Sequence, residues 1–269
     1  MKKIKSSAVV FGDMHFPLHD EQAFSCALKV IEKVKPDVFI NLGDFAEGEF
    51  VSHWRWSRRK RPPLEYQLPL IAKEADEVNH HLDRIDKVLD KVGCKRKYLA
   101  MGNHEAWYNH FVEENPYLEE YLPERLFRIE NRGYKWYPYG ELFKVEGSKL
   151  YAYHGGHYTS VNHSRITVQN LGCNVIYGHT HDCQRSVMQH ISGVHIAQSM
   201  GCLCKMQKDF LKGRKVNWTH NVGIIDFFED GWFNLIVLDI HNGMTTWNNQ
   251  IIRGNNGISR NNKKSKRNK

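Results

Sequence analysis

Side chains that bind metals recur at five places in this sequence, each time directly after a short apolar run. Together they offer two carboxylates, one amide oxygen and four imidazoles, which can fill two adjacent metal sites if one carboxylate bridges both ions. Oxygen and nitrogen donors without thiolate suit Mn, Fe or Zn at a catalytic site, because structural zinc sites are usually rich in Cys. The donors are Asp13, His15, Asp44, Asn103, His154, His179 and His181.

The five apolar runs predict buried β-strands. Ligands at the C-terminal ends of such strands gather at one edge of a sheet, where α/β proteins place their sites. A glycine beside most of the donors fits this geometry, because a chain that turns sharply benefits from a residue without Cβ. The runs cover residues 8–11, 38–42, 98–101, 150–153 and 174–177.

Amphipathic patterns predict helices between these strands. Asp20 is a suitable N-cap for the first helix, which Pro36 would stop, and Gly93 would end the second. The C-terminal part, residues 195–247, reads mostly as strands with a hairpin turn at 229–231. The expected helices cover residues 20–35, 70–92 and 160–170, with short helical pieces between 105 and 128.

The order of the donor motifs resembles that of the calcineurin-like metallophosphoesterases, whose signature reads Asp-x-His, Gly-Asp, Gly-Asn-His-Asp/Glu, a lone His and Gly-His-x-His. All five motifs occur here in that order, and the resemblance runs from about Val9 to the strands near Val237. It implies an α/β fold of two packed mixed β-sheets flanked by helices, a four-layer sandwich. It also implies a binuclear metal-dependent phosphoesterase that hydrolyses phosphate esters by a metal-bridging hydroxide.

The resemblance also implies a role for each donor. Asp44 would bridge the two ions, and His104 would stand outside both, facing the phosphate, with Glu105 as its orienting partner. His104, if protonated, could stabilise charge on the phosphate or give a proton to the leaving oxygen. The first metal would be bound by Asp13, His15, Asp44 and His181, and the second by Asp44, Asn103, His154 and His179.

Taken alone, each donor also has a purely structural interpretation. Asp44 could cap a helix and Asn103 could form a turn, as these residue types commonly do. His157 and His163 follow His154 closely and could face the substrate. The histidines that fit no motif are predicted to be non-ligands: His53, His80, His81, His110 and His220.

A basic and aromatic patch at residues 53–61 bears on the substrate, because it follows the Asp44 motif directly. Aromatic faces that stack bases, together with cations on phosphates, hold single-stranded nucleic acid. Trp54 and Arg55 are the candidate substrate contacts there, and a solvated loop whose tryptophans pack on the body is the alternative. Protein phosphatases of the resembled superfamily carry Gly-Asp-x-Val-Asp-Arg-Gly, whereas no Arg follows Asp44 here within five residues. Arg55 is therefore the candidate to replace that phosphate-binding arginine.

Composition fits one globular domain over residues 1–252, with 41% hydrophobic and 25% charged residues in the whole chain. Residues 253–269 carry seven basic and no acidic side chains, which leaves about +1 of the net +8 charge for the rest. This tail is expected to be disordered, and it could either bind nucleic acid through phosphates or keep the protein soluble.

No apolar run approaches the length of a membrane span, and the basic start leads directly into the first strand. A cytoplasmic protein without a signal peptide or a membrane partner is expected, with its six cysteines reduced. Cys202 and Cys204 are expected to pack on one side of a strand rather than to bind a metal.

The favoured function is a phosphodiesterase on nucleic acid or nucleotides with two divalent ions, Mn first and Fe or Zn as alternatives. The alternatives are a phosphomonoesterase on small molecules or phosphoproteins, and a non-catalytic nucleic-acid-binding protein of the same fold. The physiological substrate and the oligomeric state are left open.

Overall fold

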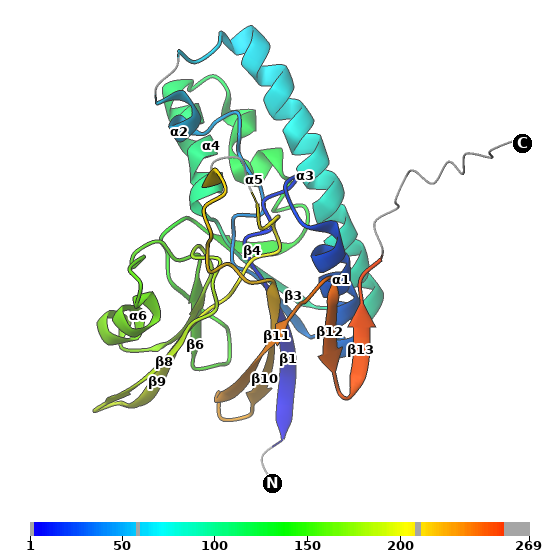
Figure 1. Ribbon diagram of the computed structural model, residues 1–269, viewed down its shortest axis with the longest axis vertical. Helices are drawn as coiled ribbons and strands as arrows, with labels where there is room; N and C mark the ends of the chain where they lie inside the picture. Colours follow the sequence, from blue (N-terminus) through cyan, green and yellow to red (C-terminus); the bar gives the residue numbers. More distant parts are fainter. Residues whose placement is uncertain (1–2, 58–59, 208–210, 256–269) are drawn as a thin grey trace, which may run out of the picture.

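Two β-sheets packed face to face form the centre of the molecule, and helices cover their outer faces (Figure 1). The computed structural model describes residues 3–57, 60–207 and 211–255. The larger sheet has the strand order β11-β10-β1-β2-β3-β4, and the smaller has β5-β6-β7-β9-β8. This arrangement is the predicted α/β sandwich of two mixed sheets.

The strands of the larger sheet run β1 (Ile4–Phe11), β2 (Val38–Asn41), β3 (Arg96–Ala100), β4 (Tyr134–Tyr137), β10 (Asn221–Phe228) and β11 (Phe233–Asp239). Those of the smaller sheet run β5 (Phe143–Lys144), β6 (Leu150–Tyr153), β7 (Asn174–Tyr177), β8 (Arg185–His190) and β9 (Gly193–Ser199). Strands β1 to β4 are parallel to one another, as are β6, β7 and β9, whereas β10, β11, β5 and β8 pair antiparallel at the edges.

The alternation of side chains along β1 shows why the sheet is buried on both faces. Val9 and Phe11 belong to the core cluster under the helices, whereas Ala8 and Val10 belong to the cluster between the two sheets. A third cluster, which includes Val168, lies under the helix on the outer face of the smaller sheet. Three hydrophobic layers thus separate four layers of structure.

Helices α1 (Glu21–Val34) and α3 (Leu64–Val92) cover the larger sheet on one face. The predicted N-cap is confirmed, because the Asp20 carboxylate accepts the Ala23 N–H at 2.9 Å. Helix α3 begins six residues before the predicted start and runs through Pro69. Pro69 is the sixth residue of the helix, so its missing N–H removes one hydrogen bond, to the carbonyl four residues earlier.

The remaining helices are short. They are α2 (His53–Trp56), α4 (Asn103–Glu114), η1 (Glu119–Tyr121), α5 (Pro123–Leu126) and α6 (His163–Leu171). The predicted hairpin turn is confirmed between β10 and β11, where Phe228 donates its N–H to the Trp232 carbonyl at 2.8 Å. No helix among the described residues is long and apolar enough to span a membrane.

A two-stranded hairpin of β12 (Met244–Trp247) and β13 (Gln250–Arg253) packs beside α1 (Figure 1). Lys29 Nζ donates to the Arg253 carbonyl at 2.7 Å. Arg253, the first residue of the predicted tail, therefore belongs to a strand of the body. Residues 256–269 lie outside the described part of the chain, so the expectation of a disordered tail stays a prediction.

Candidate metal centre

The seven predicted donors directly follow β1, β2, β3, β6 and β7, six of them in loops and Asn103 at the first residue of α4, and the two sheets bring these segments together at one end. Five of the seven have a positive φ, which non-glycine residues seldom adopt. Each such residue costs roughly 1–3 kcal/mol and persists where the surroundings fix it, often at functional sites. These residues are Asp13 (φ 52°), His15 (51°), Asp44 (48°), His179 (70°) and His181 (60°).

The donor atoms of a first group, Asp13, His15, Asp44 and His181, lie within 4.8 Å of one another. Nε2 of His181 is 3.1 Å from Oδ1 of Asp13 and 3.1 Å from Nε2 of His15. Nε2 of His15 is 3.7 Å from Oδ2 of Asp44. All four side chains are buried, so their donor atoms face one another and not the solvent.

A second group consists of Asp44, His154 and His179, and Asn103 adjoins it. Oδ2 of Asp44 is 3.3 Å from Nε2 of His154. The Asn103 amide oxygen is 3.2 Å from that nitrogen and 2.8 Å from Nδ1 of His179. Asp44 therefore belongs to both groups, which is the place that a bridging ligand would take. The structure thus brings together the side chains of both ligand sets that the resemblance implies.

Glycine is required at position 102, where the backbone passes close to the Asp44 side chain. A Cβ on Gly102 would lie 2.1 Å from Oδ1 of Asp44, and Asp44 also accepts the His104 N–H at 3.0 Å. A side chain at position 102 would displace the carboxylate that both groups share. The glycine predicted beside this donor is thus needed for close approach.

His104 stands beside Asp44 but outside both groups. Its Nδ1 is 2.6 Å from the Glu47 carbonyl oxygen, its Nε2 is 3.9 Å from Oδ2 of Asp44, and the Trp107 ring lies 4.0 Å away between centroids. The prediction that Glu105 orients His104 is wrong. The buried Glu105 carboxylate instead accepts the N–H groups of Gly102 (2.7 Å), Asp44 (2.9 Å) and Ala46 (2.9 Å), because it must satisfy backbone donors at the crossing of two loops.

Neighbouring charges in the centre shift the pKa values of its carboxylates and imidazoles. Burial by itself would raise the pKa of Asp44, but His154 and His104 hold it well below its usual value. Burial would lower the pKa of His154 and of His181, yet Asp44 raises that of His154 to about 9 and Asp13 raises that of His181 to about 10. Burial lowers the pKa of His104 to about 4. The carboxylates therefore attract positive charge to the place where the imidazoles meet.

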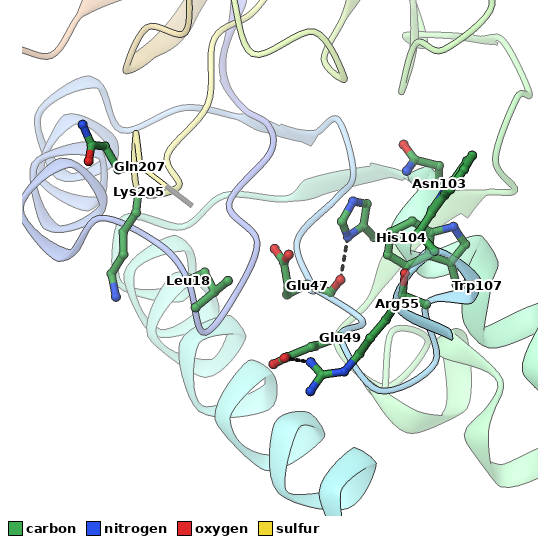
Figure 2. A pocket seen from close by; sticks show the side chains of 11 residues that line it. Leu18, Glu47, Glu49, Arg55, Asn103, His104, Trp107, Lys205 and Gln207 are labelled. Carbon is green, nitrogen blue, oxygen red and sulfur yellow. Dashed lines mark hydrogen bonds and ion pairs between the residues drawn. The ribbon is translucent and has the colours of Figure 1, made fainter. Parts of the chain in front are cut away.

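A cavity of about 800 Å³ opens beside the second donor group (Figure 2). In this view Asn103, His104 and Trp107 lie on one side, and Lys205 and Gln207 lie on the other. Trp54, which is 70% exposed, also lines it, as do Leu18, Glu47, Glu49, Ser52 and Arg55. A smaller polar cavity of about 350 Å³ is lined by His179 and Thr159, among others.

Arg55 lines the larger cavity, but its guanidinium forms an ion pair with Glu49 and lies 5.4 Å from the ring centroids of Phe50 and of Trp56. His157 lines neither cavity and is exposed, with its ring 5.3 Å from that of Tyr153. Arg58 and Arg59 of the basic patch lie outside the described residues. Among the described residues of the patch, Trp54 and Arg55 line the cavity beside the donors.

His163 is buried, bonds to its neighbours and lines the smaller cavity together with His179. Its Nδ1 is 2.7 Å from the Tyr177 hydroxyl, and its Nε2 is 2.9 Å from Oδ1 of Asp182. This network holds the loop that carries His179 and His181.

Sequence reasoning missed Glu47, Trp107 and Cys204. The Glu47 carboxylate reaches within 3.0 Å of Nδ1 of His15, and Cys204 lies beside His181. The closeness of Glu47 to Asp44 in the sequence was an available signal for the first contact. No local feature of the sequence indicated the contact between Cys204 and His181.

One family pattern, that of the calcineurin-like phosphoesterases, matches residues 7–183, which include all seven donors. Among solved structures, a double mutant of Vps29 from Entamoeba histolytica is similar, with 12% identity, a TM-score of 0.46, and coverage of 93% of this chain and 99% of that one. YfcE, a phosphoesterase from E. coli, has 15% identity and a TM-score of 0.39, with 86% and 98% covered. No curated protein sequence matches this chain.

Proposed function

We propose, from the premise that this chain belongs to the calcineurin-like phosphoesterase family, that it is a binuclear metal-dependent phosphodiesterase acting on nucleic acid or nucleotides. The observation that carries the proposal is the position of Asp44, whose carboxylate belongs to two adjoining groups of donors. A carboxylate shared in this way is what two neighbouring cations require.

The donor chemistry fits two divalent ions. The facing atoms are carboxylate oxygens, one amide oxygen and imidazole nitrogens, a set that suits Mn, Fe or Zn. The proposed ligands of the first ion are Asp13, His15, Asp44 and His181. Those of the second are Asp44, Asn103, His154 and His179. Two such ions, when bound, would polarise the phosphate and lower the pKa of a water molecule towards neutrality.

The other residues of the site would bind and orient the ester. His104 lines the larger cavity, and its ring is fixed by the Glu47 carbonyl and by Trp107. Its Nε2 lies 3.9 Å from Oδ2 of Asp44, and it would donate a proton to a leaving ester oxygen only from the protonated ring, which the lowered pKa of about 4 disfavours near pH 7. In its neutral form the ring would instead orient the ester or its leaving group. Arg55 could bind a phosphate oxygen only by sharing its guanidinium with Glu49 or leaving that ion pair.

The cavities favour a diester over a monoester. The larger one is lined by Asn103 and the smaller by His179, and these two residues are in contact at 2.8 Å. A phosphate held there could extend one substituent into each cavity. Trp54 and Trp107 would offer aromatic faces to a base in the larger cavity.

The test compares hydrolysis of bis-p-nitrophenyl phosphate and p-nitrophenyl phosphate by the Mn-loaded protein, followed by single-stranded DNA, RNA and a panel of nucleotides. Faster hydrolysis of the diester, abolished in His179→Ala, supports the proposal. Preference for the monoester would favour a phosphomonoesterase. Salt-dependent binding of single strands without hydrolysis would favour the non-catalytic alternative.

A further inference from the structure

Cys204 contacts the donors of the first group but lies outside the residues that the family pattern matches. We propose that Cys204 is a positioning residue for His181, whose ring it holds so that Nε2 faces the first metal. This inference rests on the proposed function, because it assumes that His181 binds a cation. It adds a residue that acts through a ligand and does not touch the ester.

The two nitrogens of the His181 ring have different neighbours. Nε2 is 3.1 Å from Oδ1 of Asp13 and 3.1 Å from Nε2 of His15, whereas Nδ1 is 3.8 Å from Sγ of Cys204. A histidine that binds a metal through Nε2 carries its remaining proton on Nδ1. The Cys204 sulfur is placed to accept that proton in a hydrogen bond, which selects the tautomer and fixes the ring.

The backbone around Cys204 fixes the sulfur relative to the donors. Leu203 donates its N–H to the carbonyl of Asp13 at 3.1 Å, and Lys205 donates to that of Leu18 at 2.8 Å. Nε2 of His220 is 2.7 Å from the Cys204 carbonyl oxygen. Cys204 is also completely buried. The prediction that this cysteine lies in a strand is wrong, because only isolated bridges pair it to the loop after β1.

One other predicted ligand is oriented in the same way, since Nδ1 of His154 is 2.6 Å from the Leu42 carbonyl oxygen. Nδ1 of His15 lies 3.0 Å from the Glu47 carboxylate but without hydrogen-bond geometry. Both rings turn Nε2 to the centre. Partners of this kind hold metal-binding histidines in place and tune their basicity. Cys204 gives Nδ1 of His181 a partner, as the Leu42 carbonyl does for His154.

Direct binding of the metal by sulfur is the rival explanation, because donor atoms of His15, His181 and Cys204 lie within 4.8 Å of one another. The positions of the contacts favour the indirect role. The sulfur contacts Nδ1, whereas the Asp13 carboxylate and His15 contact Nε2 of the same ring.

The experiment titrates the full metal-free chain with Co²⁺, followed by calorimetry and by absorption spectroscopy. Cys204→Ala should weaken one of the two binding steps by about 10- to 100-fold, as expected for loss of a residue that orients a ligand. Cys204→Ser should restore part of the affinity, because a hydroxyl oxygen can also accept the Nδ1 proton. The matched control is Cys26→Ala, since Cys26 is equally buried but contacts the Ile252 carbonyl far along the chain.

Affinity in Cys204→Ala equal to that of the wild type and of Cys26→Ala would overturn the inference. A sulfur-to-cobalt charge-transfer band in the wild type that disappears in Cys204→Ala would also overturn it, because the thiol would then be a ligand. If Cys204→Ala does not fold in a thermal melt, the wild-type spectrum and the serine variant decide. Full or partly reduced affinity in Cys204→Ser, with no sulfur-to-cobalt band in the wild type, supports positioning, and that band in the wild type refutes it. Failure of the wild type to bind Co²⁺ would refute the metal centre itself, so the two failures are distinguishable.

Discussion

Nε2 of His15 faces Nε2 of His181 at 3.1 Å, although 166 positions separate the two residues in the chain. Two neutral imidazoles cannot both present a lone pair at this distance, so a proton or a cation must lie between them. The carboxylates of Asp13 and Asp44 border the same space. The fold thus forms a site that favours a positive charge.

Removal of divalent ions should abolish hydrolysis and lower the melting temperature. An ion present at 100 times its dissociation constant stabilises the folded chain by about 2.7 kcal/mol, because it binds the native state and not the unfolded one. Melting curves in EDTA and in Mn²⁺, together with diester hydrolysis, check this. Identical curves under both conditions would contradict a bound ion.

Asp44→Asn should lower the turnover number for a diester by at least about a thousandfold, since a shared carboxylate supports several kcal/mol of transition-state stabilisation. The measurement is the steady-state rate with Mn²⁺. Asp239→Asn is the control, because Asp239 is an exposed carboxylate in β11. Comparable rates for Asp44→Asn and the wild type would remove Asp44 from the proposed centre.

Trp54→Ala should raise KM for a dinucleotide about tenfold and leave its turnover number unchanged, because stacking on one base is worth roughly 1–3 kcal/mol. Trp54 lines the cavity and is 70% exposed, so the folded state should lose little stability. Trp232→Ala is the control, since Trp232 is 41% exposed on the turn between β10 and β11. Equal KM values for both variants would argue against a base in this cavity.

Glu74→Gln should stabilise the metal-free protein at pH 8 more than at pH 5. Burial, and then the charge of Glu47, raise the pKa of Glu74 to about 8. A carboxyl whose folded pKa is raised costs no stability below its unfolded pKa of 4.5, and the cost grows as pH rises to about 8. Its size is roughly 1.4 kcal/mol for each unit of the rise.

Urea unfolding at several pH values measures this difference. Glutamine keeps a side-chain oxygen for the Glu49 N–H, which Glu74 accepts at 3.1 Å. Glu77→Gln, at an exposed position of the same helix, should show no such trend. A stability difference independent of pH would show that Glu74 is not held in its neutral form.

Deletion of residues 256–269 should weaken binding of single-stranded nucleic acid and reduce its dependence on salt, because the segment carries six basic residues and no acidic one. Hydrolysis of bis-p-nitrophenyl phosphate should be unchanged. The deletion begins after β13, so the contact between Lys29 and Arg253 is kept. Equal losses on both substrates would show that the segment is not a docking arm.

The sequence by itself determined much of the fold and the set of donors. Short, mostly continuous apolar runs with glycine-bounded ends predicted β1, β2, β3, β6 and β7, because parallel strands buried on both faces are apolar along their length. The Asp20 cap predicted the start of α1. The donor residues were predicted from the order of the five motifs along the chain. This order can be read from the sequence without knowledge of the fold.

Only the tertiary structure decided which atoms meet. It placed Asp44 between two donor groups, gave Glu105 three backbone donors in place of His104, and paired Arg55 with Glu49. It also brought Cys204 to His181 by pairing loops that follow different strands. Residue spacing along a chain fixes strand periods, whereas the direction of a side chain in a loop depends on backbone contacts with segments far away in sequence.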